Sequence, residues 1–192
     1  MNEWNSNDPQ LAHINLPKSK KVVNFFMWDL YIYPYLKADD KIVLDYGCGG
    51  GLFYDWLTRI STPKKYLGVD ISKRSIDECK RVVHELDHDV KTRFFKLPTL
   101  PETVPQIIVC TAVIQHMTLD QFAKFHEYVD NSGAEELFIQ IRYSDHTRYD
   151  PTQLIRRLSL SNLTFRNFEI EHESEVIPTN RYKYLHFKRV ED

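Results

Sequence analysis

Two spacings of apolar residues alternate along the chain. Continuous apolar runs are typical of strands buried on both faces, and apolar residues that recur every three or four positions are typical of amphipathic helices. These patterns predict strands over 41–45, 66–70, 90–95, 107–113, 137–143, 165–171 and 182–188, and helices over 18–32, 52–60, 72–86, 118–129 and 150–160. Strands and helices alternate until two strands follow in succession. This order predicts an α/β fold with a doubly wound, mostly parallel seven-stranded sheet, helices on both faces and a C-terminal antiparallel hairpin.

The N-terminal part should form a polar arm followed by a helix. We expect residues 1–37 to be this arm and helix, able to act as a lid, and residues 38–192 to be the main part of a single domain. Along this helix, apolar residues recur with helical spacing at Val22, Phe26, Leu30 and Tyr33, with Phe25 and Trp28 beside them. Its aromatic residues either cover a binding edge of the sheet or simply pack, and they are Trp28, Tyr31, Tyr33 and Tyr35.

Two later helices have recognisable start signals. Thr118 and Gln121 have the spacing of a capping box. The helix that they open should bury Leu119, Phe122, Phe125 and Val129. Asp150 and Pro151 place a cap and a first-turn proline at the start of the predicted helix over 150–160.

Composition limits the kind of protein. A chain of 192 residues with 42% hydrophobic residues is ordinary for one globular domain, and its net charge of −2 provides no basic field for nucleic acid. Three widely separated cysteines suggest a reducing compartment. Because no signal peptide and no apolar run of the ~20 residues needed to span a membrane is recognisable, we expect a cytoplasmic protein. Its oligomeric state stays open.

A glycine-rich turn after the first predicted strand is the strongest candidate site. Asp45 ends the strand, and Gly47, Gly49 and Gly51 follow at alternate positions before a helix that begins at Leu52. Glycines permit positive φ and leave no Cβ in the way of a ligand, and a helix start presents free backbone N–H groups. The turn therefore predicts close approach by a nucleotide-like ligand.

Asp70 ends the second predicted strand, beside this turn. An acid at this place can accept hydrogen bonds from the vicinal hydroxyls of a ribose, although it can also simply cap the next helix. A dinucleotide fingerprint would read G-x-G-x-x-G/A, but Leu52 stands at its third conserved place. The spacing therefore argues against a nicotinamide-dependent oxidoreductase.

Three segments, 45–51, 67–72 and 108–117, are similar in this order to motifs of the class I (Rossmann-like) S-adenosylmethionine-dependent methyltransferases. The first reads Asp-x-Gly-x-Gly-x-Gly, the second resembles the ribose motif and the third resembles the fourth strand. The resemblance implies S-adenosylmethionine as cofactor, with its methionine part at the turn, its ribose at Asp70 and its adenine beside Ile71 and Leu97. The cofactor-binding residues that it implies are Asp45, Gly47, Cys48, Gly49, Gly51, Asp70, Ile71, Leu97 and Thr111.

The chain departs from the family pattern at two points. Lys96 and Leu97 stand where many members carry an acid or an amide for the adenine amine, and Gln106 stands where many carry an aspartate. The adenine contact could then come from the backbone or be absent. Core packing remains the alternative role for Ile71 and Leu97.

His116, after the fourth predicted strand, is the candidate catalytic residue. Histidine titrates near neutral pH, so it could remove a proton from an acceptor if the chemistry requires a base. A capping or core role is the alternative. Polar residues after the fifth strand either line an acceptor pocket or form a solvated loop, and they are Arg142, Tyr143, Asp145 and His146.

Other motifs argue less well for function. His84-Glu85-Leu86-Asp87-His88 matches a zinc-protease pattern, which needs a buried cleft and a third ligand. Here the motif ends a peripheral helix, contains the charged Asp87 and is followed at once by a strand, so we expect no metal site. Basic and aromatic residues interleave over 181–189, which is typical of an edge strand more than of a nucleic-acid surface. Enzymes that methylate amino groups of DNA bases often carry an Asn/Asp-Pro-Pro-aromatic motif after the fourth strand. Residues 111–114 read Thr-Ala-Val-Ile instead, which argues against that class of enzyme.

These observations predict an S-adenosylmethionine-dependent methyltransferase that acts on a small molecule. Near-neutral charge and the absence of a recognisable nucleic-acid motif support the small acceptor. The alternative is a non-catalytic binding or scaffolding module that retains the fold. The acceptor and the methylated atom cannot be identified from these residues.

Overall fold

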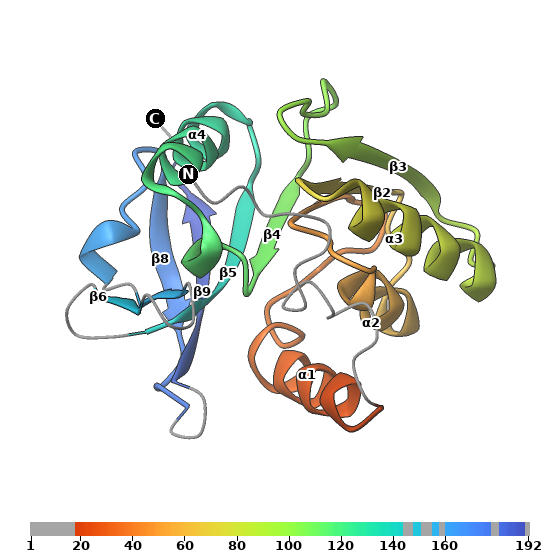
Figure 1. The fold of residues 1–192 in the computed structure, drawn as a ribbon, viewed down its shortest axis with the longest axis horizontal. Helices are drawn as coiled ribbons and strands as arrows, with labels where there is room; N and C mark the ends of the chain where they lie inside the picture. The colour runs from red at the N-terminus through yellow and green to blue at the C-terminus, as the bar shows by residue number, and fades with distance from the viewer. Residues whose placement is uncertain (1–17, 144–147, 151–154, 158–159, 178–180, 191–192) are drawn as a thin grey trace. The chain divides into compact units, whose positions relative to one another are not determined.

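The computed structural model describes residues 18–143, 148–150, 155–157, 160–177 and 181–190 (Figure 1). Internal contacts separate the chain into two compact units, residues 1–103 and 104–192. Seven strands belong to one mixed sheet, which is mostly parallel with antiparallel strands toward the C-terminus. This arrangement confirms the predicted fold class.

The first unit contains three parallel strands. Its elements are α1 (Lys18–Tyr31), β1 (Ile42–Tyr46), α2 (Leu52–Ile60), β2 (Lys65–Asp70), α3 (Lys73–Leu86) and β3 (Lys91–Lys96). The strand order is β3-β2-β1, with Asp45 opposite Gly68 and Asp70 opposite Lys96. Because the strands are parallel, the glycine turn, Asp70 and Leu97 all follow carboxyl ends at one edge.

The second unit continues with parallel and then antiparallel pairing. Its elements are β4 (Ile107–Thr111), η2 (Ile114–His116), α4 (Leu119–Asn131), β5 (Glu136–Arg142), β6 (Arg148–Asp150), β7 (Ile155–Arg157), η3 (Leu160–Asn162), β8 (Phe168–Glu173) and β9 (Tyr182–Arg189). The strand order is β4-β5-β9-β8, and β6 and β7 form a separate two-stranded sheet. β4 is parallel to β5, whereas β9 is antiparallel to both β5 and β8.

Burial at consecutive strand positions explains the apolar runs in the sequence. Four consecutive residues of β2 are buried, as are five in β5 and the first four of β4. Since successive side chains point to opposite faces, both faces of these strands are covered. In the first unit, α3 contacts β2 and β3 and also packs against α2 (Figure 1).

The predicted helix starts at Ser72 and Thr118 are confirmed. Ser75 N donates to Ser72 Oγ at 3.2 Å and begins α3. At the start of α4, Gln121 N donates to Thr118 Oγ1 at 3.2 Å and Thr118 N donates to Gln121 Oε1 at 2.8 Å, which is a complete capping box.

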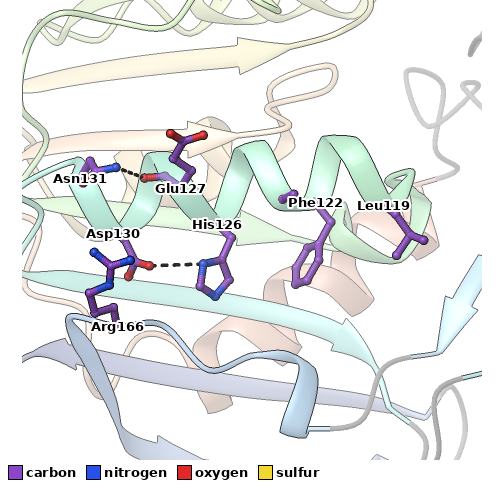
Figure 2. A pocket seen from close by; sticks show the side chains of 8 residues that line it. Leu119, Phe122, His126, Glu127, Asp130, Asn131 and Arg166 are labelled. Atoms are coloured by element: carbon purple, nitrogen blue, oxygen red, sulfur yellow. Dashed lines mark hydrogen bonds and ion pairs between the residues drawn. The ribbon is translucent and has the colours of Figure 1, made fainter.

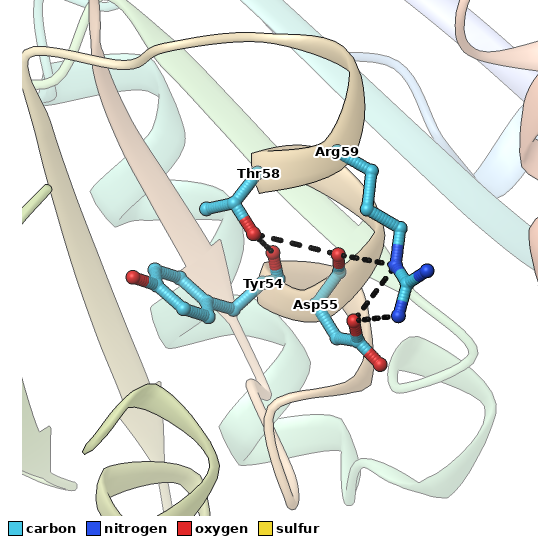
Figure 3. Close-up of polar contacts among 4 residues, drawn as sticks. All are labelled: Tyr54, Asp55, Thr58 and Arg59. Carbon is cyan, nitrogen blue, oxygen red and sulfur yellow. Dashed lines mark hydrogen bonds and ion pairs between the residues drawn. The ribbon is translucent and has the colours of Figure 1, made fainter. Parts of the chain in front are cut away.

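Helix α2, which begins directly after the glycine turn, is reinforced on its outer side (Figure 3). Arg59 Nε and Nη2 donate to Asp55 Oδ1 at 2.9 Å and 2.7 Å. Thr58 Oγ1 donates to the carbonyl oxygen of Tyr54 at 3.0 Å. An exposed ion pair one turn apart contributes only about 0.3–0.5 kcal/mol, so packing dominates the stability of α2.

Helix α1 packs through Trp28, one of the apolar residues beside the recurring positions. The recurring positions themselves are exposed, with fractions of 65% at Val22, 59% at Phe26, 48% at Leu30 and 50% at Tyr33. Trp28 is buried instead, with its ring 5.3 Å from Phe53 and 5.6 Å from Trp56. Trp56 Nε1 also donates to Asp29 Oδ1 at 2.8 Å. The Trp28 ring contacts and this hydrogen bond determine which face of α1 packs against α2. The spacing of apolar residues alone does not determine it.

Three expectations require correction. Leu119 is 72% exposed because it is the first residue of α4, while Phe125 and Val129 are buried as predicted. The predicted helix over 150–160 is wrong, because residues 148–150 and 155–157 are strands and residues 151–154 lie outside the described part. An Asp-Pro pair suits turns as well as helix starts. Strand β9 lies between β5 and β8 and is not an edge strand.

The described helices include none that is long and apolar enough to cross a membrane.

Candidate functional site

The glycine turn joins β1 to α2 through residues with positive φ. The φ angles are 87° at Gly47, 51° at Gly49 and 84° at Gly51. The N–H groups of Gly47 and Cys48 donate to the carbonyl oxygen of Val69 at 2.7 Å and 3.0 Å, which ties the turn to β2. Left-handed conformations are rare for other residues, so this path depends on glycine.

Other backbone N–H groups of the turn point elsewhere. Gly51 N donates to the carbonyl oxygen of Cys48 at 3.0 Å and closes the turn, and Gly49 N donates to Asp70 Oδ2 at 3.0 Å. Three N–H groups donate to no acceptor among the described residues, those of Gly50, Leu52 and Phe53. The first turn of α2 therefore supplies the donors for an anionic group, while Gly47 and Cys48 build the scaffold.

The glycines in and beside the turn differ in how closely other atoms pack against them. A Cβ at Gly51 would lie 3.0 Å from Cys79 Sγ, and a Cβ at Gly68 would lie 2.7 Å from the Phe94 ring. Among the described residues, a Cβ at Gly49 would meet nothing closer than 4.0 Å. The space beside Gly49 is therefore open to a ligand, whereas Gly51 and Gly68 serve close packing of α3 and β3.

Asp45 is a buried carboxyl group at the end of β1. It is 1% exposed, and its Oδ2 accepts a hydrogen bond from the hydroxyl of Tyr66 at 2.5 Å. Within the described part of the chain, Oδ1 has no hydrogen-bond donor. Burial raises the pKa of Asp45 to about 7, the Tyr66 hydrogen bond opposes this increase, and the charge of Asp70 adds to it.

Asp70 holds the turn against the start of α3. Its Oδ2 accepts from Gly49 N at 3.0 Å, and its Oδ1 accepts from Ser72 N at 2.8 Å. Burial raises the pKa of Asp70, while backbone hydrogen bonds from Ser72, Gly49 and Ile71 oppose the increase. Each carboxylate oxygen has further lone pairs, so Asp70 can accept additional hydrogen bonds from hydroxyl groups.

Ile71 and Leu97 flank Asp70 in the first unit. Ile71 is 40% exposed and directly follows the carboxyl end of β2. Leu97 is partly buried, and its N–H donates to the carbonyl oxygen of Asp70 at 3.0 Å. The first unit thus brings together eight of the nine predicted cofactor residues at one strand edge.

Thr111 and His116 belong to the second unit. Thr111 is the last residue of β4 and pairs with Gln140 of β5. His116 ends η2, a short helix that contacts β5 and β7, and its N–H donates to the carbonyl oxygen of Val113 at 2.8 Å. Its ring is partly buried. Thr111 thus lies at the carboxyl end of β4 and His116 follows it, as predicted.

The second unit also has a shallow groove along α4 (Figure 2). His126 lies in it, with Nδ1 at 3.3 Å from Asp130 Oδ2 and Nε2 at 2.5 Å from the carbonyl oxygen of Thr164. None of the predicted site residues lines this groove, whose lining is Leu119, Phe122, Ala123, His126, Glu127, Asp130, Asn131 and Arg166.

The remaining candidates are residues of the loop after β5, the aromatic residues of α1 and metal-ligating side chains. Asp145 and His146 lie outside the described residues. Trp28 packs against α2, which favours packing over a lid role for this residue. Among the described residues, no three histidine, cysteine or carboxylate side chains gather where they would hold a metal ion.

The residues at the turn fit the three polar parts of S-adenosylmethionine. Asp45 keeps one carboxylate oxygen without a donor from the described residues, which suits an ammonium group. The N–H groups at the start of α2 suit a carboxylate, and the partly used oxygens of Asp70 suit ribose hydroxyls. The open space at Gly49 permits close approach.

Sequence reasoning missed the side chains that support these groups. Tyr66 contacts Asp45, and Cys79 lies under Gly51. A hydrogen bond with Cys79, together with burial, raises the pKa of the Cys48 thiol. One signal was available, because a glycine inside a strand, such as Gly68, often marks close approach of another group.

The comparisons with known proteins agree with this geometry. Residues 43–133 match a family model described as a methyltransferase domain. Magnesium protoporphyrin IX methyltransferase (ChlM) from Synechocystis, solved with bound SAM, is 15% identical, with a TM-score of 0.62 over 94% of this chain and 80% of that chain. A S-adenosylmethionine-dependent methyltransferase from Clostridium acetobutylicum is 14% identical, with a TM-score of 0.64 over 94% of this chain and 98% of that chain.

The small RNA methyltransferase HEN1 is 20% identical, with a TM-score of 0.60 over 92% of this chain and 26% of that chain. No curated protein matches the chain in sequence. At these identities the solved structures establish the fold alone. The methyltransferase assignment comes from the family model that matches residues 43–133.

Proposed function

We propose that this chain, which is a class I S-adenosylmethionine-dependent methyltransferase, transfers the cofactor's methyl group to a small-molecule acceptor. The observation that carries the site assignment is the joint placement of the glycine turn, Asp45 and Asp70 in the first unit. The alternative of a non-catalytic module is not retained, because the methyltransferase-domain match supports an enzyme.

In this proposal each group of the first unit binds one part of the cofactor. Asp45 accepts a hydrogen bond from the ammonium group, and the N–H groups at the start of α2 bind the carboxylate. Asp70 accepts hydrogen bonds from the ribose hydroxyls, and Ile71 and Leu97 flank the adenine. When bound, S-adenosylmethionine supplies a methyl group on a positively charged sulfur, which a nucleophile displaces in line.

The second unit has one residue of the proposed cofactor set and the proposed base. Thr111, at the end of β4, completes the proposed cofactor set. His116 takes the proton that an acceptor hydroxyl or amine loses as it is methylated, and positioning supplies much of the remaining acceleration. The net charge of −2 favours a small acceptor over nucleic acid.

An Asp70→Asn variant tests the cofactor site. We expect its affinity for S-adenosylmethionine, measured by calorimetric titration, to fall roughly 10- to 100-fold, because hydrogen bonds to a charged group contribute about 1.5–3 kcal/mol. Asp77→Asn is the matched control, since Asp77 is an exposed α3 carboxylate paired with Lys73 at 2.5 Å. Equal affinity in wild type and Asp70→Asn would reject the assignment of Asp70.

A His116→Ala variant tests the proposed base. Turnover should fall by about 10²–10⁴-fold, because this is the usual contribution of general base catalysis, while affinity for S-adenosylhomocysteine stays unchanged. His84→Ala, at the end of α3, is the control and should keep full turnover. Unchanged turnover in His116→Ala would leave His116 with a structural role only.

The acceptor class is tested by following a labelled methyl group. Purified enzyme is incubated with S-adenosylmethionine that carries a radioactive methyl group and with a fractionated cell extract. We expect the label in the acid-soluble small-molecule fraction. Label recovered in precipitated RNA, DNA or protein would contradict the small-molecule proposal while leaving the cofactor assignment intact.

A further inference from the structure

The hydroxyl of Tyr66 makes a buried contact with the carboxylate of Asp45. Tyr66 is 0% exposed and Asp45 is 1% exposed, so water cannot replace this hydrogen bond. The two residues lie on neighbouring parallel strands, where Asp45 is opposite Gly68, two residues beyond Tyr66. Gly68 has no side chain, and the Phe94 ring and Cys48 Sγ occupy the space that its Cβ would take. The Tyr66 ring is therefore held within a closely packed layer.

The groups that face Asp45 are almost all acids. From β2 come the Tyr66 hydroxyl and the Asp70 carboxyl group, and from the glycine turn comes the Cys48 thiol. The Cys79 thiol of α3 lies beyond Cys48 and interacts with Tyr66 as well. Among these described neighbours, the Tyr66 hydroxyl is the one that favours the charged form of Asp45, since burial and Asp70 both oppose it.

We infer that Tyr66 is a positioning residue of the cofactor site: by donating to Oδ2, it orients the Asp45 carboxylate and favours its charged form, so that Oδ1 can bind the ammonium group of S-adenosylmethionine. This inference rests on the proposed cofactor site. Tyr66 itself touches Asp45 and acts through it. A phenylalanine at this position would keep the ring and remove only the donor.

A pH dependence of cofactor affinity follows from the burial of Asp45. Its pKa is raised to about 7 by burial, so below this pH the carboxyl group is increasingly neutral and cannot pair with an ammonium group. Affinity should therefore be constant well above pH 7 and should fall toward tenfold per pH unit below it. Loss of the Tyr66 hydrogen bond should move this fall to higher pH.

The experiment compares two ligands over a range of pH in wild type, Tyr66→Phe and Tyr54→Phe. The ligands are S-adenosylhomocysteine and its deamino analogue, which keeps the adenosine, the thioether and the carboxylate. At about pH 7 we expect Tyr66→Phe to bind S-adenosylhomocysteine roughly tenfold more weakly, with its pH profile displaced upward. The deamino analogue should bind wild type and Tyr66→Phe equally, and its affinity should not fall below pH 7.

Tyr54→Phe is the matched control. The Tyr54 hydroxyl is also enclosed, its ring lies 5.0 Å from that of Tyr66, and it has no hydrogen-bond partner among the described residues. We therefore expect wild-type affinity and an unchanged pH profile. A general packing defect in Tyr66→Phe would weaken both ligands alike, and that result would overturn the inference.

The remaining outcomes separate the inference from the proposed function. Wild type that binds neither S-adenosylhomocysteine nor its analogue would reject the cofactor site itself. Wild type that binds S-adenosylhomocysteine, with Tyr66→Phe equal to it in affinity and pH profile, would reject the role of Tyr66 and leave the proposed function standing. If Tyr66→Phe is too unstable to titrate, a pH-dependent preference of wild type for S-adenosylhomocysteine over the deamino analogue must still appear, and its absence would overturn the inference.

Discussion

An Asp45→Asn variant is expected to be more stable than the wild-type chain at about pH 8, by about 2–4 kcal/mol, and to bind S-adenosylmethionine roughly 10- to 100-fold more weakly. Both effects have one cause. Asp45 is buried beside the Asp70 carboxyl group, and the described residues provide it with a tyrosine hydroxyl as its hydrogen-bond partner. The charge that we propose for binding the cofactor is therefore costly to the folded protein.

The sign of the pH effect follows from the raised pKa. Burial raises the pKa of Asp45 from 3.8 to about 7 in the folded chain, so between these values the folded state holds a proton that the unfolded state has released. The stability due to this proton is present at low pH and is lost as pH rises through about 7. Asparagine stays neutral, so the advantage of the variant should increase from acidic to alkaline pH.

Urea unfolding of both proteins at about pH 5 and about pH 8 measures this difference. Asp77→Asn is the control, because Asp77 is an exposed carboxylate of α3 and should change stability by no more than about 0.5 kcal/mol. An Asp45→Asn protein that is less stable than wild type at about pH 8 would contradict the cost that we assign to this charge.

The second large effect is expected at Gly51. Alanine there would keep a φ of 84° and would place its Cβ 3.0 Å from Cys79 Sγ and 3.3 Å from Cys79 Cα. Left-handed strain costs about 1–2 kcal/mol and overpacking about 1–3 kcal/mol, so Gly51→Ala should lower the free energy of unfolding by about 2–4 kcal/mol. Relief would require α3 to move away from the turn.

Gly49→Ala is the matched variant, because its φ is also positive but, within the part of the chain that the structure describes, its Cβ would meet nothing closer than 4.0 Å. We expect it to lose only about 1–2 kcal/mol of stability from backbone strain. Its methyl group would nevertheless occupy the open space beside the turn, so cofactor affinity should fall in a folded protein. Equal destabilisation by the two alanines would mean that packing against Cys79 is unimportant.

Local signals predicted the parts of the fold that depend on neighbours in sequence. The glycine turn, the caps at Ser72 and Thr118 and the apolar strands are each specified by residues a few positions apart, and the structure contains them. The expected placement of Asp45 and Asp70 at one strand edge also follows from a general property of parallel sheets.

Contacts between distant residues were not predictable in the same way. Helix α1 has two apolar faces, and the face that packs is the one that contacts Trp56. Trp56 comes 27 residues after Asp29, to which its indole donates a hydrogen bond. The Asp-Pro pair at 150–151 suggests a helix start, but Asp150 is the last residue of strand β6 and another strand begins at Ile155. Tyr66 reads as one apolar strand residue among several until the register of β1 and β2 places it beside Asp45.

The aromatic contact between α1 and α2 also gives the first unit an optical reporter. Trp28 and Trp56 have ring centroids 5.6 Å apart, and residues 104–192 contain no tryptophan. Tryptophan emission should therefore follow unfolding of the unit that contains Asp45 and Asp70, whereas far-ultraviolet circular dichroism follows helices and strands of both units. Transitions that coincide would mean that the two units unfold as one cooperative structure, and transitions that separate would mean that they do not.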